Sequence, residues 1–334
     1  MKGLIVSSSP HQRSPMTTQK IMLNVCIALL PACAAGTWIF GLRAALVLLT
    51  CAVSCVMFEY LTRIIMKKEQ TISDLSAVVT GLLLGMNLPS TIPLWICMVG
   101  SFIAIVIVKQ LFGGLGQNFA NPAIVARIVL MLSCGSAMTN WVRPFNYNLL
   151  GGDTITEATP LAREWFEYSA NGVSQLIAPY TPSEMLFGAS GGCLGETCSI
   201  ALIFGGLYLM LRKIISPAAP LSFIAVVWLS TLIYTGSFDI AGYQVFAGGL
   251  LLGAFFMATD YATTPITTKG KIIFGIGCGL ITFLIRQFGA FPEGVSFSIL
   301  LMNILTPYID RLTATKPLGA RLPEKKKKEA AANG

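Results

Sequence analysis

The chain has 334 residues, of which 54% are hydrophobic and only 11% are charged. A soluble domain carries about 25% charged residues, so this composition excludes an ordinary soluble protein and indicates one that lies in a membrane. The net charge of +8 does not indicate a nucleic-acid partner, because the basic residues lie between apolar stretches and in the C-terminal tail.

Many apolar stretches approach the ~20 residues that a helix needs to cross ~30 Å of hydrocarbon. We therefore predict an all-α polytopic membrane protein with ten transmembrane helices. The predicted spans are residues 21–41, 44–62, 75–89, 93–112, 122–142, 186–211, 219–235, 243–259, 272–291 and 294–310. Spans three and eight are short and rich in glycine.

Basic residues follow spans two, six and eight, on the same side as the basic N-terminal segment. Because Lys and Arg concentrate in cytoplasmic loops, both termini are predicted to be cytoplasmic. The chain then divides into a cytoplasmic N-terminal segment 1–20, a first five-helix repeat 21–142, an extracytoplasmic loop 143–185, a second five-helix repeat 186–311 and a basic cytoplasmic tail 312–334.

The two five-helix parts share a short sequence. Gly81–Gly85 in span three reads Gly-Leu-Leu-Leu-Gly, and Gly249–Gly253 in span eight repeats it. Because each half has an odd number of spans, the second half is predicted to be inverted relative to the first. Inverted repeats place their sites near the mid-plane, where helices are short or broken. The alternative is that the two helices use glycine independently for close packing.

The long loop at 143–185 carries a threonine hydroxyl that could accept a bulky group. Thr159 precedes Pro160, which favours an extended backbone at the threonine, and Ala158 leaves room beside it. The predicted topology places this hydroxyl outside the cytoplasm. From the residues alone, an ordinary turn that contains proline remains the simpler interpretation.

Two asparagines between spans four and five indicate a polar binding edge on the cytoplasmic side. Asn118 and Asn121 offer hydrogen-bond donors and acceptors together, which suits a neutral ring with an amide-rich edge. A helix N-cap before Pro122 would explain Asn121 but not Asn118. Asp260 follows span eight on the same side and can approach the asparagines; a role as a helix cap is the equal alternative.

Two carboxylates fall within predicted spans. Glu196 lies among the glycines of span six, and Glu59 lies in span two. Ionisable residues at membrane depth are candidates for ion or proton pathways, and both residues are candidates for such a path. The alternative is a neutral, hydrogen-bonded acid that faces the helix bundle.

Four motifs occur together in the chain. They read Asn-x-x-Asn-Pro-Ala from residue 118, Ala-Thr-Pro-Leu from residue 158, Gly-Gly-x-x-Gly-Glu-Thr from residue 191 and Met-Ala-Thr-Asp from residue 257. With them, the chain resembles the RnfD family of the Rnf electron-transport complex, which is related to a membrane component of the sodium-pumping NADH:quinone oxidoreductase. This resemblance implies a fold like that of urea transporters, with two inverted five-span repeats.

The resemblance also implies a covalent flavin. In the family, FMN is joined through its phosphate to the threonine that ends a Ser/Thr-Gly-Ala-Thr motif, and here this residue is Thr159. The motif begins at Thr156, and Asp153 and Pro160 also match, whereas Glu157 stands where glycine is usual. A separate flavin transferase makes the attachment outside the membrane.

A second flavin, riboflavin bound without a covalent bond, is implied near the cytoplasmic side. The positions that match the family are Asn118, Asn121 and Asp260, the same residues that form the predicted amide edge. Two flavins on opposite sides of the bilayer would carry electrons across it, and the redox chemistry belongs to these cofactors.

The function implied is that of a membrane-embedded flavoprotein subunit in a cation-translocating ferredoxin:NAD⁺ oxidoreductase, which moves Na⁺ or H⁺. NAD and ferredoxin are expected on partner subunits, which include a second FMN-bearing subunit and further membrane subunits. The expected location is the cell membrane of a bacterium or archaeon. The alternative functions are a solute channel or transporter on the same inverted-repeat scaffold, without a redox cofactor, and a cofactor-free assembly subunit.

Overall fold

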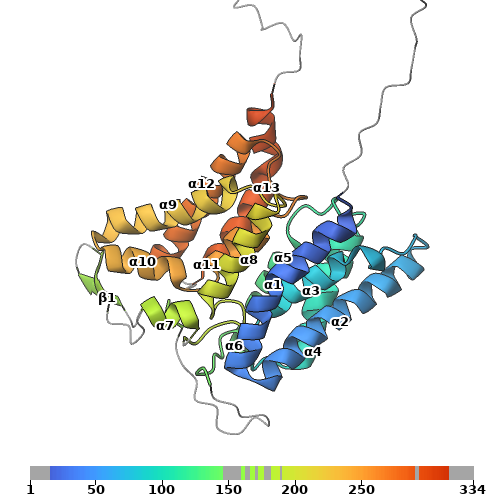
Figure 1. The fold of residues 1–334 in the computed structure, drawn as a ribbon, viewed down its shortest axis with the longest axis horizontal. Helices are drawn as coiled ribbons and strands as arrows, with labels where there is room; N and C mark the ends of the chain where they lie inside the picture. The colour runs from blue at the N-terminus through green and yellow to red at the C-terminus, as the bar shows by residue number, and fades with distance from the viewer. Residues whose placement is uncertain are drawn as a thin grey trace, which may run out of the picture.

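The computed structural model describes residues 16–145, 159–161, 166–169, 172–176, 182–188, 190–289 and 293–315. Most of these residues are helical. Helices α1 to α6 gather on one side of the view in Figure 1, and helices α8 to α13 on the other, with α8 packed beside α1. The start of α1 and the end of α13 both lie toward the top of this view.

The described residues of the first half form six α-helices, one short 3₁₀ helix and one π-helix. They are α1 (Thr18–Phe40), α2 (Leu42–Ile65), η1 (Ile72–Asp74), α3 (Ser76–Met86), α4 (Leu94–Phe102), η2 (Ile103–Gln110), α5 (Pro122–Ser133) and α6 (Gly135–Met138). The π-helix η2 directly continues α4, so that the two form one continuous helical segment over 94–110.

The second half begins with a short antiparallel hairpin, β1 (Phe166–Ser169) and β2 (Gly172–Leu176), which the sequence did not predict. The helices that follow are α7 (Pro182–Phe187), α8 (Ser199–Leu211), α9 (Ala218–Thr235), α10 (Phe238–Phe246), α11 (Leu250–Leu252), η4 (Gly253–Met257), α12 (Thr268–Phe288) and α13 (Val295–Thr313). Here a π-helix, η4, directly continues α11.

Side-chain caps define several helix ends. Thr17 accepts a hydrogen bond at the start of α1, and Thr267 does the same at the start of α12. Asn121 caps α5, where Pro122 occupies the first helical position and loses no intrahelical hydrogen bond. Gly236 ends α9 with a φ of 69°, which glycine adopts at little cost.

The structure confirms a helical, polytopic membrane protein. Among the described residues, α1, α2, α9 and α12 are long and apolar enough to cross a bilayer, and α10 with α11 and η4 forms a fifth such segment bent by 64°. Predicted spans three to six correspond to shorter apolar helices, and span ten corresponds to α13, which has 19 residues but is less apolar than these five segments. The count of ten crossings therefore stays a prediction.

Three predicted spans differ from the helices observed. Span six was predicted as one helix over 186–211, but α8 begins only at Ser199; residues 190–198 are non-helical because their glycines favour turns. Span eight, 243–259, is interrupted between α10 and α11 by residues 247–249. Span five, 122–142, holds a helix only to Ser133, followed by the short α6.

The repeated glycines have a packing role in the first half. A Cβ atom placed on Gly81 of α3 would lie 2.6 Å from the Cα of Ala52 in α2, so these helices approach each other more closely than a side chain would allow. Helices α3 and η4 end at Met86 and Met257, next to the breaks predicted after spans three and eight. The inverted relation of the halves remains a prediction.

Candidate functional site

A polar-ended pocket lies where the two halves of the chain meet. Its cavity volume, counted as the space that a water molecule can occupy, is about 90 Å³, and the cavity opens to the solvent. Its polar lining residues are Ser76, Thr80, Lys109, Asn118, Asn121, Thr259, Asp260 and Tyr261. Its apolar walls come from α1, α3, α8 and η4, with Phe256 among them. The pocket therefore combines an apolar slot with convergent amide, hydroxyl and charged groups.

The two asparagines predicted as a binding edge line this pocket together. Asn121 is the N-cap of α5, since its Oδ1 accepts from the backbone N–H of Ala123 at 3.0 Å. Its Nδ2 donates to the carbonyl oxygen of Met257 at 3.3 Å, which ties α5 to the end of η4. Asn118 donates to the carbonyl oxygen of Ala120 at 2.9 Å. The N-cap alternative thus holds for Asn121, which lines the pocket as well.

Asp260 meets the asparagines in the pocket, as predicted. Burial raises the pKa of its carboxyl group, and the hydrogen bonds from the Ala262 N–H, the Thr263 hydroxyl and the Asn118 amide, together with the charge of Lys109, oppose that rise. The hydroxyl of Thr263 lies 3.2 Å from Asp260 Oδ2. The carboxyl group is thus a half-buried acid on the pocket wall, with neighbours that hold it in place.

A second polar group lies at the centre of the molecule, where Arg127 of α5 binds two glutamates. Its Nη2 lies 3.0 Å from Glu196 Oε1 and also contacts Glu293. Its Nη1 donates to Asn87 Oδ1 at 2.6 Å. All four side chains are buried, so one cation and two carboxyl groups lie together inside the protein. We refer to Arg127, Glu196 and Glu293 as the central cluster.

Non-helical segments from the two halves position the central cluster. The backbone N–H of Leu194 donates to Leu88 O at 3.1 Å, and that of Gly195 donates to Met86 O at 2.7 Å. A Cβ atom on Gly195 would lie 2.8 Å from the Cβ of Met86, so only glycine fits. Glu196 therefore stands on a turn that packs against the end of α3.

Two carboxylates share the single guanidinium of Arg127. Arg286 and Glu293 both lie beside Gly248. A Cβ atom added to Gly248 would be 3.4 Å from Arg286 Nη2 and 3.3 Å from Glu293 Oε1, so the two side chains are near each other. The Arg286 guanidinium also donates to Ala247 O at 3.0 Å. Cations therefore flank the glutamate pair on two sides, an arrangement that can respond to a proton or a metal cation.

Glu59, the other predicted ion-path residue, is part of a different group. Its carboxylate forms an ion pair with Lys109 at 3.0 Å, and both side chains are buried. Thr71 and Gln110 donate to the same carboxylate. The pair borders the pocket through Lys109, and it shares no contact with the central cluster among those described.

The structure describes Thr159 and Pro160, whereas Asp153 and Thr156 lie outside the described residues. Thr159, Pro160 and Leu161 are buried. Leu161 packs in an apolar cluster with Ile240 and Tyr243 of α10. Apolar packing at Leu161 holds this segment against α10, and Thr159 is buried as well. The role of Thr159 as an acceptor remains a prediction.

Sequence reasoning did not select Arg127, Glu293 or Lys109 as site residues. Arg127 could have been found as a charge inside an apolar span, and Lys109 as a base at the end of span four. Glu293 gives no such signal, because it lies in the short connection between α12 and α13. Its proximity to Arg127, 166 residues away in sequence, arises only from the tertiary fold.

These features define a helical membrane protein with a polar pocket and a buried charge cluster between its two halves. The model of the NQR2, RnfD, RnfE family matches residues 5–319. The chain belongs to this family, and the resemblance inferred from its motifs is confirmed.

Three relatives, each the D component of an oxidoreductase complex, match over nearly their whole length. The chain is 47% identical to that of the Na(+)-translocating ferredoxin:NAD(+) oxidoreductase complex of Acetobacterium woodii, over 99% of each chain. It is 44% identical to that of the proton-translocating ferredoxin:NAD(+) oxidoreductase complex of Clostridium ljungdahlii, over 95% of this chain and 96% of that one. It is 38% identical to that of the ion-translocating oxidoreductase complex of Stutzerimonas stutzeri, over 91% and 92%.

Proposed function

We propose that the protein is the membrane-embedded flavoprotein subunit of a cation-translocating ferredoxin:NAD⁺ oxidoreductase. The observation that carries this proposal is the 47% identity with the D component of such a complex over 99% of both chains. NAD and ferredoxin bind partner subunits, and a second FMN-bearing subunit and further membrane subunits complete the complex. The complex works in the cell membrane of a bacterium or archaeon, with both termini of this subunit in the cytoplasm.

The pocket is the proposed site of a non-covalent riboflavin. Its lining fits a flat, mostly apolar ring with a polar edge, since Phe256 and aliphatic side chains form the walls and Asn118, Asn121 and Asp260 converge at one end. A bound flavin would supply one- and two-electron transfer. The asparagines would orient the ring edge, and Asp260 would be a further polar partner for that edge.

Thr159 is the proposed attachment point of a covalent FMN, added by a flavin transferase outside the membrane. A threonine hydroxyl has the chemistry to form a phosphoester, and the Thr-Pro sequence matches the family motif. Because Thr159 is buried in this structure, its hydroxyl has to become accessible before it can react.

The central cluster is the proposed position of the cation path. Glu196 and Glu293 are two carboxylates that share one arginine, so that a change of charge nearby alters the balance between them. Either Na⁺ or H⁺ can take part in that balance. Glu59 remains a candidate for the path, but in this structure Lys109 neutralises it.

The covalent flavin is tested on a denaturing gel under ultraviolet light. Wild-type protein from cells that contain the transferase is expected to give a fluorescent band, and Thr159→Ala a dark one. A dark wild-type band contradicts the covalent flavin. If no extractable flavin is present either, the alternative of an inverted-repeat channel or transporter is favoured.

The riboflavin site is tested by extraction. Asn118→Leu and Asp260→Leu are expected to lose extractable flavin while the fluorescent band remains. Gln117→Leu is the matched control, because Gln117 is the exposed neighbour of Asn118. Equal extractable flavin in Asn118→Leu, Asp260→Leu and Gln117→Leu would contradict the site.

The cation path is tested in the reconstituted complex. Glu196→Gln is expected to preserve electron transfer but to lower the number of cations moved for each electron. Unchanged coupling in Glu196→Gln removes this residue from the path.

A further inference from the structure

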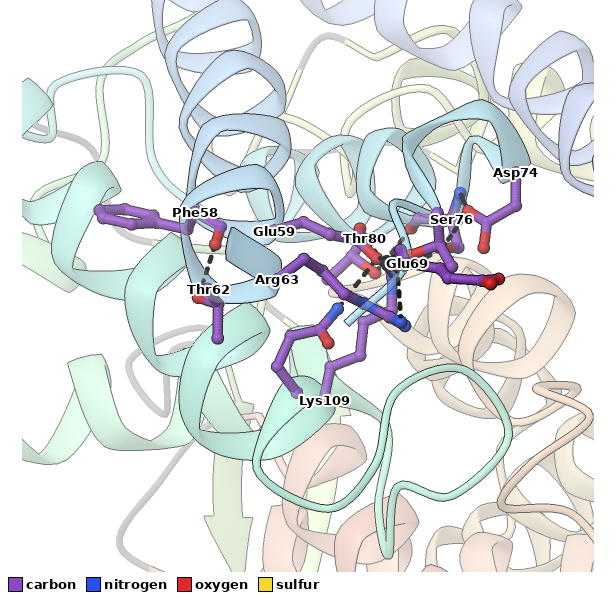
Figure 2. Close-up of polar contacts among 11 residues, drawn as sticks. Phe58, Glu59, Thr62, Arg63, Glu69, Asp74, Ser76, Thr80 and Lys109 are labelled. Carbon is purple, nitrogen blue, oxygen red and sulfur yellow. Dashed lines mark hydrogen bonds and ion pairs between the residues drawn. The ribbon is translucent and has the colours of Figure 1, made fainter. Parts of the chain in front are cut away.

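A buried lysine borders the pocket from the end of the π-helix η2. Lys109 Nζ lies 3.1 and 3.0 Å from the two carboxylate oxygens of Glu59 and 2.6 Å from Ser76 Oγ. Figure 2 shows Lys109 reaching towards Glu59 and Ser76, between α2 and the start of α3. Lys109 is only 2% exposed and Glu59 is 0% exposed, so the pair is shielded from solvent.

Hydrogen bonds fix both partners. An ammonium group has three N–H donors, and the contacts of Lys109 with Glu59 and Ser76 account for three. The Glu59 carboxylate also accepts from Thr71 and Gln110, each at 2.9 Å. A buried ion pair is tolerated when its remaining sites are satisfied in this way. Lys109 is thus held as a charged group in one position.

The charge of Lys109 acts on the pocket. Lys109 and Ser76 both line it, together with Asp260, and the charge of Lys109 lowers the pKa of Asp260. The side chain therefore lies between two environments: Glu59 on one side, and on the other the group that occupies the pocket.

We propose that the Glu59–Lys109 pair sets the reduction potential of the flavin bound in this pocket. This inference rests on the proposed riboflavin site. The first electron, which a one-electron carrier on a partner subunit supplies, adds one negative charge to the ring before any proton is taken up. Lys109 stabilises that charge electrostatically, while Glu59 holds Lys109 in the wall and weakens its effect on the ring.

The two residues therefore act with opposite sign. Removal of the positive charge makes reduction harder, so Lys109→Gln lowers the midpoint potential. Removal of the negative charge leaves Lys109 less compensated, so Glu59→Gln raises it. A purely structural role predicts something different, because either variant breaks the same ion pair and disturbs the pocket in the same way.

The test is a spectroelectrochemical titration of the full-length chain in detergent. All variants carry Thr159→Ala, so that only the non-covalent flavin is measured. We expect Lys109→Gln and Glu59→Gln each to change the ratio of affinities for reduced and oxidised flavin by about tenfold or more, in opposite directions. Lys109→Arg keeps the positive charge, so its midpoint potential should stay close to that of the Thr159→Ala parent.

The double variant Glu59→Gln/Lys109→Gln leaves no unpaired buried charge, so it keeps the test usable if a single variant does not fold. Its potential should lie below that of Glu59→Gln and above that of Lys109→Gln. Shifts of the same sign, or no shift, overturn the proposal while riboflavin binding stands. A parent protein that holds no non-covalent flavin overturns both.

Discussion

At the scale of single residues, Asp260 is a half-buried carboxyl group on the wall of the pocket. Its pKa is raised by burial, so the folded protein binds a proton there more strongly than the unfolded chain does. Its contribution to stability is therefore lost as the pH rises from the unfolded pKa of about 3.9 to the folded pKa. Asp260→Asn removes this loss.

We expect Asp260→Asn to raise the thermal midpoint of unfolding relative to wild type at pH 8, with a smaller increase at pH 4.5. Both proteins are dialysed first to remove non-covalent flavin. Unfolding in detergent, followed by circular dichroism, measures this difference. Asp239→Asn is the control, because Asp239 is exposed at the start of α10. A gain that does not depend on pH contradicts the assignment of this loss to burial of the Asp260 carboxylate.

Arg127 is the residue whose loss should affect stability most. Its replacement by Gln leaves Glu196 and Glu293 buried without their shared cation, and breaking a buried ion pair costs about 3–5 kcal/mol. We expect a large decrease in the free energy of unfolding of Arg127→Gln in detergent. Arg212→Gln, at an exposed position after α8, should change it by less than about 1 kcal/mol. Similar losses in both variants would argue against the central cluster.

The sequence predicted the contacts between residues that are close in the chain better than the contacts between residues that are far apart in it. Asn118 and Asn121 are neighbours, and Asp260 was placed near them because topology put both loops on one side. Glu196 was selected as a charge in an apolar span. Its pairing with Glu293 could not be predicted, because it depends on the non-helical turn around Gly195 and on the position of a connection between two later helices.

At the scale of elements, both π-helices end at the pocket. Helix η2 supplies Lys109, and η4 supplies Phe256 and leads to Asp260. Wider helical turns often occur at functional sites, and here each one brings a side chain to the pocket wall. Hydropathy located the apolar segments 93–112 and 243–259, but it carries no information on the hydrogen-bond pattern that distinguishes a π-helix from an α-helix.

The packing of α3 against α2 leads to a prediction about glycine. In Gly81→Ala, the new methyl group would be 2.6 Å from the Cα of Ala52, and such overpacking costs about 1–3 kcal/mol. The matched control is Gly242→Ala in α10, where no heavy atom lies within 4 Å of the added Cβ; there alanine should be neutral or stabilising by up to about 1 kcal/mol. Equal thermal midpoints for the two variants would contradict this close contact.

At the scale of the whole molecule, polar contacts join the halves in addition to the apolar packing of α8 on α1. Asn121 binds the end of η4, and Arg127 reaches Glu196 and Glu293 from the other half. The helical class followed from composition alone. The number of crossings did not follow from composition, because α3 has 11 residues and α8 has 13. Both are shorter than the ~20 residues of an independent span. Such helices stay at membrane depth only when other helices surround them.

The number of crossings decides the side on which the loop 143–185 lies. Five crossings before the loop place it outside, whereas only two long apolar helices, α1 and α2, precede it among the described residues, and two crossings would return it to the cytoplasm. A phosphatase that is active only outside the cytoplasm distinguishes these cases. We expect activity when it is inserted after Ser169, and none when it is fused after Lys68 or after residue 334, since basic residues lie at both fusion points. An inactive phosphatase after Ser169 would contradict the prediction of five crossings before the loop. It would also contradict the extracytoplasmic position of Thr159 that the attachment of FMN requires.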